Sequence, residues 1–106
     1  MTTDNPLIGE VSTEQIAQWS RKYPAGIYAI AIDGHIAYFR QPDRKVINFS
    51  ISQLNPGAPL DYFEHILRET LIGGSNAIID EDALFLGAIP VIKEKIEAKK
   101  AQLVNL

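Results

Sequence analysis

The sequence predicts an α+β domain in which a capped helix is followed by an antiparallel β-hairpin and then by three or four helices. Two apolar runs joined by Asp33 and Gly34 indicate the hairpin, because this dipeptide tolerates the positive φ angles of a type I′ turn. Ser12 and Gln15 have the spacing of a capping box, which indicates where the first helix begins. Apolar residues at helical spacing from Leu60 onward indicate the later helices.

The length and composition of the chain fit one globular domain. Its 106 residues are 46% hydrophobic and 22% charged, both near the averages of soluble domains. We expect residues 1–10 to form a flexible leader and residues 11–106 to fold as a single α+β domain. The formal net charge of −3 argues against a nucleic-acid partner, and the absence of cysteine excludes disulfide and thiolate chemistry. Without a signal-peptide pattern or an apolar run of about 18 residues, we expect a cytoplasmic protein with no membrane partner.

The first helix is expected over residues 13–22. Val11 and Ile16 have the spacing of a hydrophobic staple across its N-terminus, and Trp19 extends the same apolar stripe. Pro24 follows the stripe closely and cannot continue a helix, so the chain must leave the helix before it.

The hairpin, expected over residues about 26–41, is apolar on both faces. If Asp33 and Gly34 form its turn, alternate residues of the two strands share a face. One face then carries Tyr28, Ile30, Ile32, Ala37 and Phe39, and the other carries Ile27, Ala29, Ala31, Ile36 and Tyr38. Because an isolated hairpin is marginal in water, helices of this chain or another chain must cover both faces.

The segment Lys45–Leu54 fits two different structures. Ile47, Phe49 and Ile51 alternate with polar residues, and this period of two slightly favours a strand. A helical stripe also runs through the segment and consists of Val46, Ile47, Ser50, Ile51 and Leu54. Asp43 stands where it would cap such a helix. The pattern by itself leaves both structures open.

Two further helices are expected in the C-terminal half of the chain. Pro59 is well placed as the first residue of one helix, and Gly73 as its C-terminal cap. The other helix runs from about Asp82 to Gln102, with acidic residues where the partial positive charge of a helix start favours them. Pro90 must kink or divide this last helix.

No catalytic, cofactor-binding or metal-binding set is predicted. His35 and His65 are accompanied by neither a nucleophile nor a third metal ligand. The acids at residues 80–82 are consecutive, so a helix start explains them better than a cation site. Residues 73–75 lack the spacing and the lysine of a phosphate loop. The lysines between residues 93 and 100 form either a solvated helix face or a partner-binding face.

Three short motifs, in this order along the chain, are similar to those of one protein family. The aromatic second strand runs into Phe39-Arg40-Gln41-Pro42-Asp43-Arg44, Gly73-Gly74 follows a helix, and Leu103-Val104-Asn105-Leu106 comes last. In these features residues 26–106 resemble the small tail assembly chaperones of tailed phages and prophages. The helix expected over residues 13–22 lies outside the resemblance.

The resemblance implies both a fold and a role. Members place helices after the hairpin, which selects the helix for Lys45–Leu54 against its period of two. They are not enzymes, and they bind the long helical tape measure protein in the cytoplasm of the bacterial host until tail tube subunits polymerise around it. The resemblance therefore implies a helical, tape-measure-like partner, weak homo-oligomers and no cofactor.

The resemblance also implies an apolar contact surface for that partner. The residues expected to form this surface are Tyr28, Tyr38, Phe39, Arg40, Leu103, Val104 and Leu106. For each of the aromatic residues, packing in the core of the domain is an equally good account.

Two other interpretations stay open. The chain is alternatively an unrelated small interaction or regulatory protein, for example a dimer whose hairpins pair across a two-fold axis. An enzyme or small-ligand binder is the third interpretation, and it would need several of His35, His65, Glu64 and the acids at 80–82 to converge in one pocket.

Overall fold

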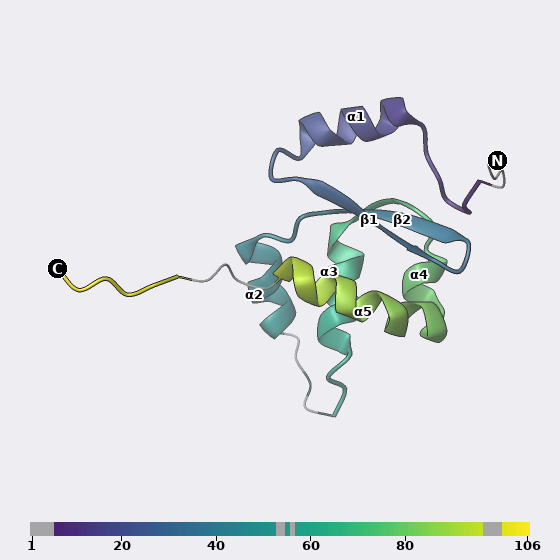
Figure 1. Cartoon of the computed structure of the whole chain (residues 1–106). Coiled ribbons are helices and arrows are strands. Elements are labelled where there is room, and N and C mark those ends of the chain that lie inside the picture. Colours follow the sequence, from purple (N-terminus) through teal and green to yellow (C-terminus); the bar gives the residue numbers. More distant parts are fainter. Residues whose placement is uncertain (1–5, 53–54, 56, 97–100) are drawn as a thin grey trace.

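A three-stranded antiparallel sheet separates one helix from all the others (Figure 1). The computed structural model describes residues 6–52, 55, 57–96 and 101–106. Its elements in chain order are α1 (Thr13–Lys22), β1 (Ile27–Ile32), β2 (His35–Arg40), α2 (Arg44–Ser52), α3 (Asp61–Thr70), β3 (Leu71–Gly74), α4 (Ala77–Asp80) and α5 (Asp82–Ile96). The strand order is β1-β2-β3, so β2 is the central strand. The predicted α+β class is confirmed.

The hairpin forms as the sequence predicts. Asp33 and Gly34 have φ angles of 50° and 81°, the two positive values that a type I′ turn requires. Tyr28 pairs with Phe39 and Ile32 with His35, which is the predicted register. The two faces of the hairpin therefore carry the residues assigned to them from the sequence.

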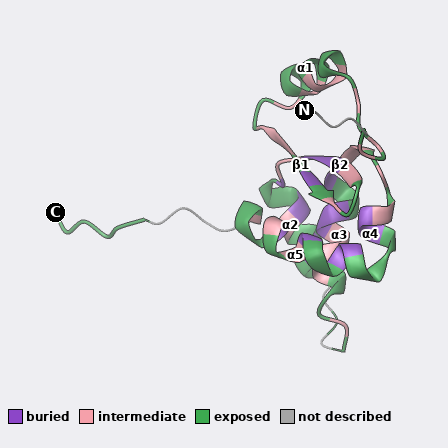
Figure 2. Cartoon of the chain, turned by 45° about the vertical axis from the view of Figure 1, so that its right-hand side comes forward, coloured by how far each residue is buried: buried purple, intermediate pink, exposed green. Residues whose placement is uncertain are grey.

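The hydrophobic core lies between the sheet and the layer of α2 to α5 (Figure 2). From the sheet it receives Ile30, Ala37 and Phe39, which are at most 2% exposed. The helices contribute Val46, Ile66, Leu67, Ile78, Ile79, Leu84, Phe85, Ala88 and Ile92. This face of the hairpin is therefore covered by helices of the same chain.

Helix α1 lies on the opposite face of the sheet (Figure 1). Its N-terminus is capped by the Ser12 side chain, which accepts a hydrogen bond from the Gln15 N–H at 3.1 Å. Trp19 packs on Tyr38 with ring centroids 5.4 Å apart, but no residue of α1 is itself buried. Ala29 and Ala31, on the same face of β1, are exposed. Helix α1 thus shields β2 and leaves β1 open on this side.

Strand β3 is absent from the sequence prediction, which placed Gly73 at the end of a helix. Helix α3 instead ends at Thr70, and the chain turns at once into an extended strand paired with β2. The glycines permit this close approach: a Cβ on Gly73 would lie 2.6 Å from the Trp19 ring, and one on Gly74 would lie 2.7 Å from the Ala37 Cα. Glycine is required at both positions because Trp19 and the backbone of β2 leave no room for a Cβ. The prediction that Gly73 caps a helix is therefore wrong.

Part of the expected leader is paired with the sheet. The Ile8 N–H donates to the Gly34 carbonyl at 2.8 Å, and the Ile36 N–H donates to the Ile8 carbonyl at 2.9 Å. Gly9 has a φ of 95°, and a Cβ there would meet backbone atoms of Ile36 and Ser75 at 2.5 and 2.4 Å. Residues 1–5 of the expected flexible leader lie outside the described residues.

Segment 44–52 is a helix, α2, so the helical alternative is confirmed and the strand is wrong. The Asp43 carboxylate accepts a hydrogen bond from the Val46 N–H at 2.9 Å and so satisfies one of the free donors at the helix start. Phe49 lies off the buried stripe and is 50% exposed, which explains the misleading period of two. Leu54, also in the predicted stripe, lies outside the described residues.

The bounds of the last two long helices differ from the predicted ones. Helix α3 begins at Asp61 rather than at Pro59. Helix α5 runs without interruption from Asp82 to Ile96 and contains Pro90, so the proline does not divide it. Residues 101–106 have no regular structure, so Gln102 is not helical.

Replacement of Gly74 by alanine should strongly destabilise the fold. Gly74 has a φ of 99°, and the new Cβ would lie only 2.7 Å from the Ala37 Cα, so the change would strain the pairing of β2 with β3 at a cost of about 3 kcal/mol. Urea denaturation measures this loss of unfolding free energy. Gly57→Ala is the control, because a Cβ there meets only the Asn55 side chain at 3.5 Å, and it should change stability by less than about 1 kcal/mol. Equal midpoints for the two variants would contradict the role given to Gly74.

Candidate protein-binding groove

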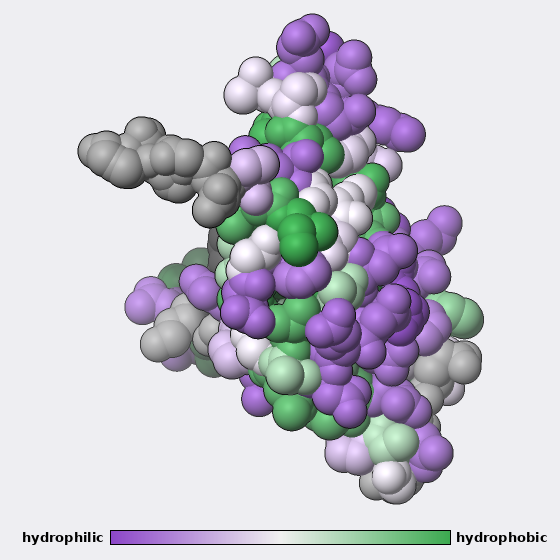
Figure 3. All heavy atoms as spheres, turned by 90° about the vertical axis from the view of Figure 1, so that its right-hand side faces the viewer, coloured by the Kyte–Doolittle hydropathy of each residue, from purple (hydrophilic) through white to green (hydrophobic). Residues whose placement is uncertain are grey.

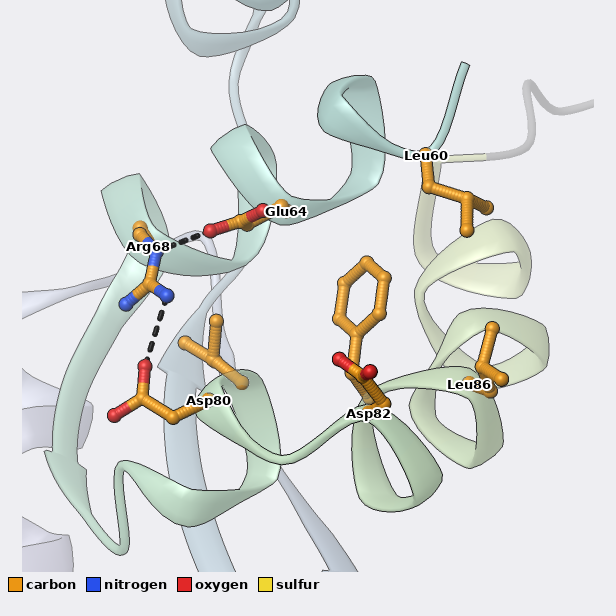
Figure 4. Close-up of a pocket in the computed structure, with 8 residues that line it drawn as sticks. Leu60, Glu64, Arg68, Asp80, Asp82 and Leu86 are labelled. Carbon is orange, nitrogen blue, oxygen red and sulfur yellow. Dashed lines mark hydrogen bonds and ion pairs between the residues drawn. The ribbon is translucent and has the colours of Figure 1, made fainter. Parts of the chain in front are cut away.

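A hollow of about 440 Å³ lies where α3 faces α4 and the start of α5 (Figure 4). Its lining residues are Leu60, Glu64, Arg68, Ile79, Asp80, Asp82, Phe85 and Leu86. We refer to this hollow as the α3–α5 groove. The face of the molecule that carries α4 shows hydrophobic surface among hydrophilic groups (Figure 3).

The α3–α5 groove has an apolar side built from α4, α5 and the residue that precedes α3. Ile79 and Phe85 belong to the hydrophobic core and are 4% and 8% exposed, so they form the floor. Leu60 and Leu86 stand at the rim and are 44% and 54% exposed. Two exposed leucines therefore stand beside a nearly buried aromatic ring, which makes this side of the hollow apolar.

The other side of the α3–α5 groove is charged (Figure 4). The Arg68 guanidinium donates to the carboxylates of Glu64 and Asp80, each at 2.8 Å. The hydrogen bond to Asp80, followed by that to Glu64, raises the pKa of Arg68. Asp82 forms no ion pair within the described part of the chain. Three carboxylates and one guanidinium give the lining a net charge of −2.

This combination suits one kind of ligand. An apolar floor between exposed leucines accepts the apolar face of a helix, and an acidic rim favours lysine or arginine beside that face. The side chains of the lining are four apolar residues, three carboxylates and one guanidinium. The α3–α5 groove is therefore a candidate binding surface for a basic amphipathic helix.

The seven predicted contact residues do not form one surface. Phe39 is fully buried in the core, and Tyr38 is 5% exposed beneath Trp19, so the structure favours core packing for both. Arg40 contacts the Glu69 carbonyl at 3.3 Å and lies 3.7 Å from the Asp43 carboxylate. The apolar residues of the C-terminal segment, Leu103, Val104 and Leu106, are 90%, 68% and 119% exposed.

Tyr28 occupies the border between core and surface. Its ring stacks on Phe39 at 5.6 Å, and the Lys95 ammonium lies 5.0 Å from the ring centroid. Its hydroxyl is buried without a hydrogen-bond partner among the described residues. Burial raises the pKa of Tyr28, and the nearby Thr70 hydroxyl acts in the opposite direction. The hydrogen of the Thr70 hydroxyl is donated to the Ile66 carbonyl at 2.7 Å.

Each histidine joins two elements through a serine. The His35 Nδ1 lies 2.8 Å from the Ser75 hydroxyl, which ties β2 to the segment before α4. The His65 Nδ1 lies 3.3 Å from the Ser50 hydroxyl and links α3 to α2. Among the described residues, no three histidine or acidic side chains are placed to hold a metal ion.

Comparisons with protein-family models, with curated proteins and with solved structures returned no match. In the described part of the chain, no helix has the length and apolar character needed to cross a membrane. The proposed function therefore rests on the geometry of the site and on the sequence motifs.

Reasoning from the sequence missed the α3–α5 groove. In the sequence Leu60 is the first of the apolar residues at helical spacing, and the structure exposes nearly half of it. A signal was nevertheless present, because Leu86 lies outside the buried stripe of α5 that contains Leu84, Phe85 and Ala88. Such an off-stripe leucine marks a position where the outer surface of the helix is apolar.

Replacement of Tyr28 by phenylalanine should stabilise the domain by about 1 kcal/mol, because it removes a buried hydroxyl that has no partner among the described residues. The raised pKa of Tyr28 in the folded state also means that the wild-type protein loses stability as the pH rises above the ordinary tyrosine value of 10.0. The variant should lose less stability in that range. Denaturant melts at pH 7 and above pH 10 measure both effects, and a destabilised variant would show that the hydroxyl has a partner.

Proposed function

We propose that this protein is a non-enzymatic binding module that keeps a helical partner soluble. The observation that supports this proposal is the α3–α5 groove, where a buried floor is flanked by exposed Leu60 and Leu86. A helix laid along this groove would cover both leucines and exclude water from Phe85.

The charge of the groove supports a partner with basic residues beside its apolar face. Asp82 has no ion pair within the described residues. The single positive charge of Arg68 balances only one of the two negative charges on Glu64 and Asp80. A lysine or arginine at the edge of a bound helix would compensate these charges. The C-terminal segment, with Leu103, Val104 and Leu106 exposed, offers a second apolar contact.

The short motifs of residues 26–106 extend this proposal to a particular class of protein. They resemble those of tail assembly chaperones, which bind a tape measure protein whose long helices would otherwise aggregate. A long amphipathic helical partner is the kind of ligand that the α3–α5 groove fits. We therefore propose that the protein is a chaperone of this type and that its partner resembles a tape measure protein.

Co-expression with the long helical protein encoded nearby tests the proposal. The wild-type chain should keep that protein soluble and be retained with it on an affinity resin. The variant Leu60→Ser/Leu86→Ser should lose most of this retention, because it removes the exposed apolar rim of the groove.

The control variant is Ile8→Ser/Ile51→Ser. It removes two aliphatic side chains of similar exposure, 60% and 50%, that do not line the groove. It should retain the partner like the wild type, and circular dichroism should show both variants folded. Equal retention by all three proteins would contradict a role for the groove, and failure of the wild type to retain the partner would contradict the proposed function.

Replacement of Arg68 by glutamine tests the charge of the groove separately. The change leaves Glu64 and Asp80 without their cation, so a lysine-rich amphipathic peptide should bind about threefold more tightly at low salt. Because Arg68 is about half exposed, the cost to stability should stay below about 1 kcal/mol. Fluorescence anisotropy of a labelled peptide measures the affinity, and weaker binding by the variant would show that the groove does not select basic ligands.

A further inference from the structure

Strand β1 forms one edge of the sheet, and its outward backbone groups face away from the rest of the sheet. In this hairpin the residues that flank the turn, Ile32 and His35, form a hydrogen-bonded pair, and such pairs alternate along the ladder. The N–H and C=O groups of Ile27, Ala29 and Ala31 therefore point away from β2. Within the described residues, no hydrogen bond satisfies the outward groups of Ala29 or Ala31.

The pairing on the other side of β2 confirms this alternation. The Ile36 N–H donates to the Ile8 carbonyl at 2.9 Å, and the Ile36 carbonyl accepts from the Ser75 N–H at 2.8 Å. Ile36 is opposite Ala31, so its backbone points toward β3 while that of Ala31 points to the open edge.

Strand β1 itself carries none of the usual features that protect an edge from pairing, and α5 packs beside it with the Lys95 ammonium 5.0 Å from the Tyr28 ring. Proteins generally block an edge strand with a charge, a proline, a bulge or a covering segment. Strand β1 reads Ile-Tyr-Ala-Ile-Ala-Ile, with no charge and no proline. Ala29 and Ala31 are exposed, and α1 contacts the sheet through Trp19 at Tyr38 and Gly73, which belong to β2 and β3.

We propose that β1 pairs antiparallel with β1 of a second copy, so that two sheets join into one of six strands. Placing Ala29 opposite Ala29 of the second copy puts Ile27 opposite its Ala31. This register pairs the three outward-pointing residues of each strand with one another, as an antiparallel ladder requires.

The strand itself favours a second copy over an unrelated segment. In this register the small Ala31 faces the large Ile27, so the side chains on that face complement one another across the two-fold axis. Tyr28 lies opposite Ile30 of the second copy, and both belong to the face that packs on the helices. No charged residue of β1 opposes a like charge.

The proposed contact produces a closed dimer. A two-fold pairing uses the same edge of both copies, so it yields a dimer and leaves no free β1 edge for further growth. An edge of six residues buries less than the roughly 1,200 Å² of a standard stable interface, so the dimer should depend on concentration. The contact does not use the α3–α5 groove, so its test is separate from the test of partner binding.

Sedimentation of the full chain over a range of concentrations tests the proposal. The mass should rise from 11.8 kDa toward twice that value for the wild type. Ala29→Pro should remain monomeric, because the N–H that it removes points to the open edge and not to β2. Ala31→Lys should also remain monomeric, since it places like charges at the edge, whereas Ala17→Lys on the exposed surface of α1 should dimerise like the wild type.

Amide hydrogen exchange identifies the interface directly. The Ala29 and Ala31 amides should exchange at least about tenfold more slowly at high than at low protein concentration. The Tyr28 and Ile30 amides, which pair with β2, should be protected at every concentration. A monomer at all concentrations, a dimer with unprotected Ala29 and Ala31 amides, or an assembly larger than a dimer would each overturn the proposal.

Discussion

The rest of the structure depends on the need to bury β2 on both of its faces. Ala37, Tyr38 and Phe39 are consecutive, so they point alternately to opposite sides of the sheet, and all three are buried. Phe39 requires the layer of α2 to α5, and Tyr38 requires Trp19 of α1. The two-layer arrangement of helices follows from this one strand.

The glycines of β3 allow α1 to cover the second face of β2. Trp19 reaches the sheet over Gly73, where a Cβ would lie 2.6 Å from its ring. Gly74 and Gly9 allow β3 and the N-terminal segment to approach the backbone of β2. Gly9 is far in the sequence from the adjacent Gly73 and Gly74, and the three share a role only because each lies against β2 or against Trp19.

The predictions that succeeded rest on local signals. Asp33 and Gly34 specify the turn, the turn specifies the register, and Ser12 marks the start of α1. Strand β3 and the α3–α5 groove could not be predicted in this way. Gly73 is equally suited to a helix cap and to close strand packing, and only the position of Trp19 distinguishes the two.

The same distinction applies to the candidate site. Leu60 and Leu86 are 26 residues apart, and although Leu86 lies off the apolar stripe of its helix, nothing in the sequence places it near Leu60. Their meeting in one groove depends on how α3 packs beside α5. Conversely, the sequence leaves partner contact and core packing equally open for Tyr38 and Phe39, and the structure buries both. The sequence shows which residues are apolar, but tertiary packing decides which of them are exposed.

A small domain with a doubly apolar sheet has too few elements to cover all of its apolar surface. Helices α2 to α5 cover one face, and the single helix α1 reaches only part of the other, so the outward edge of β1 stays open. Between α3 and α5, Phe85 lines the groove at 8% exposure, and Leu86 stands at the rim. Both open places arise from one limit, the number of helices available, and we propose that both serve contacts with other protein chains.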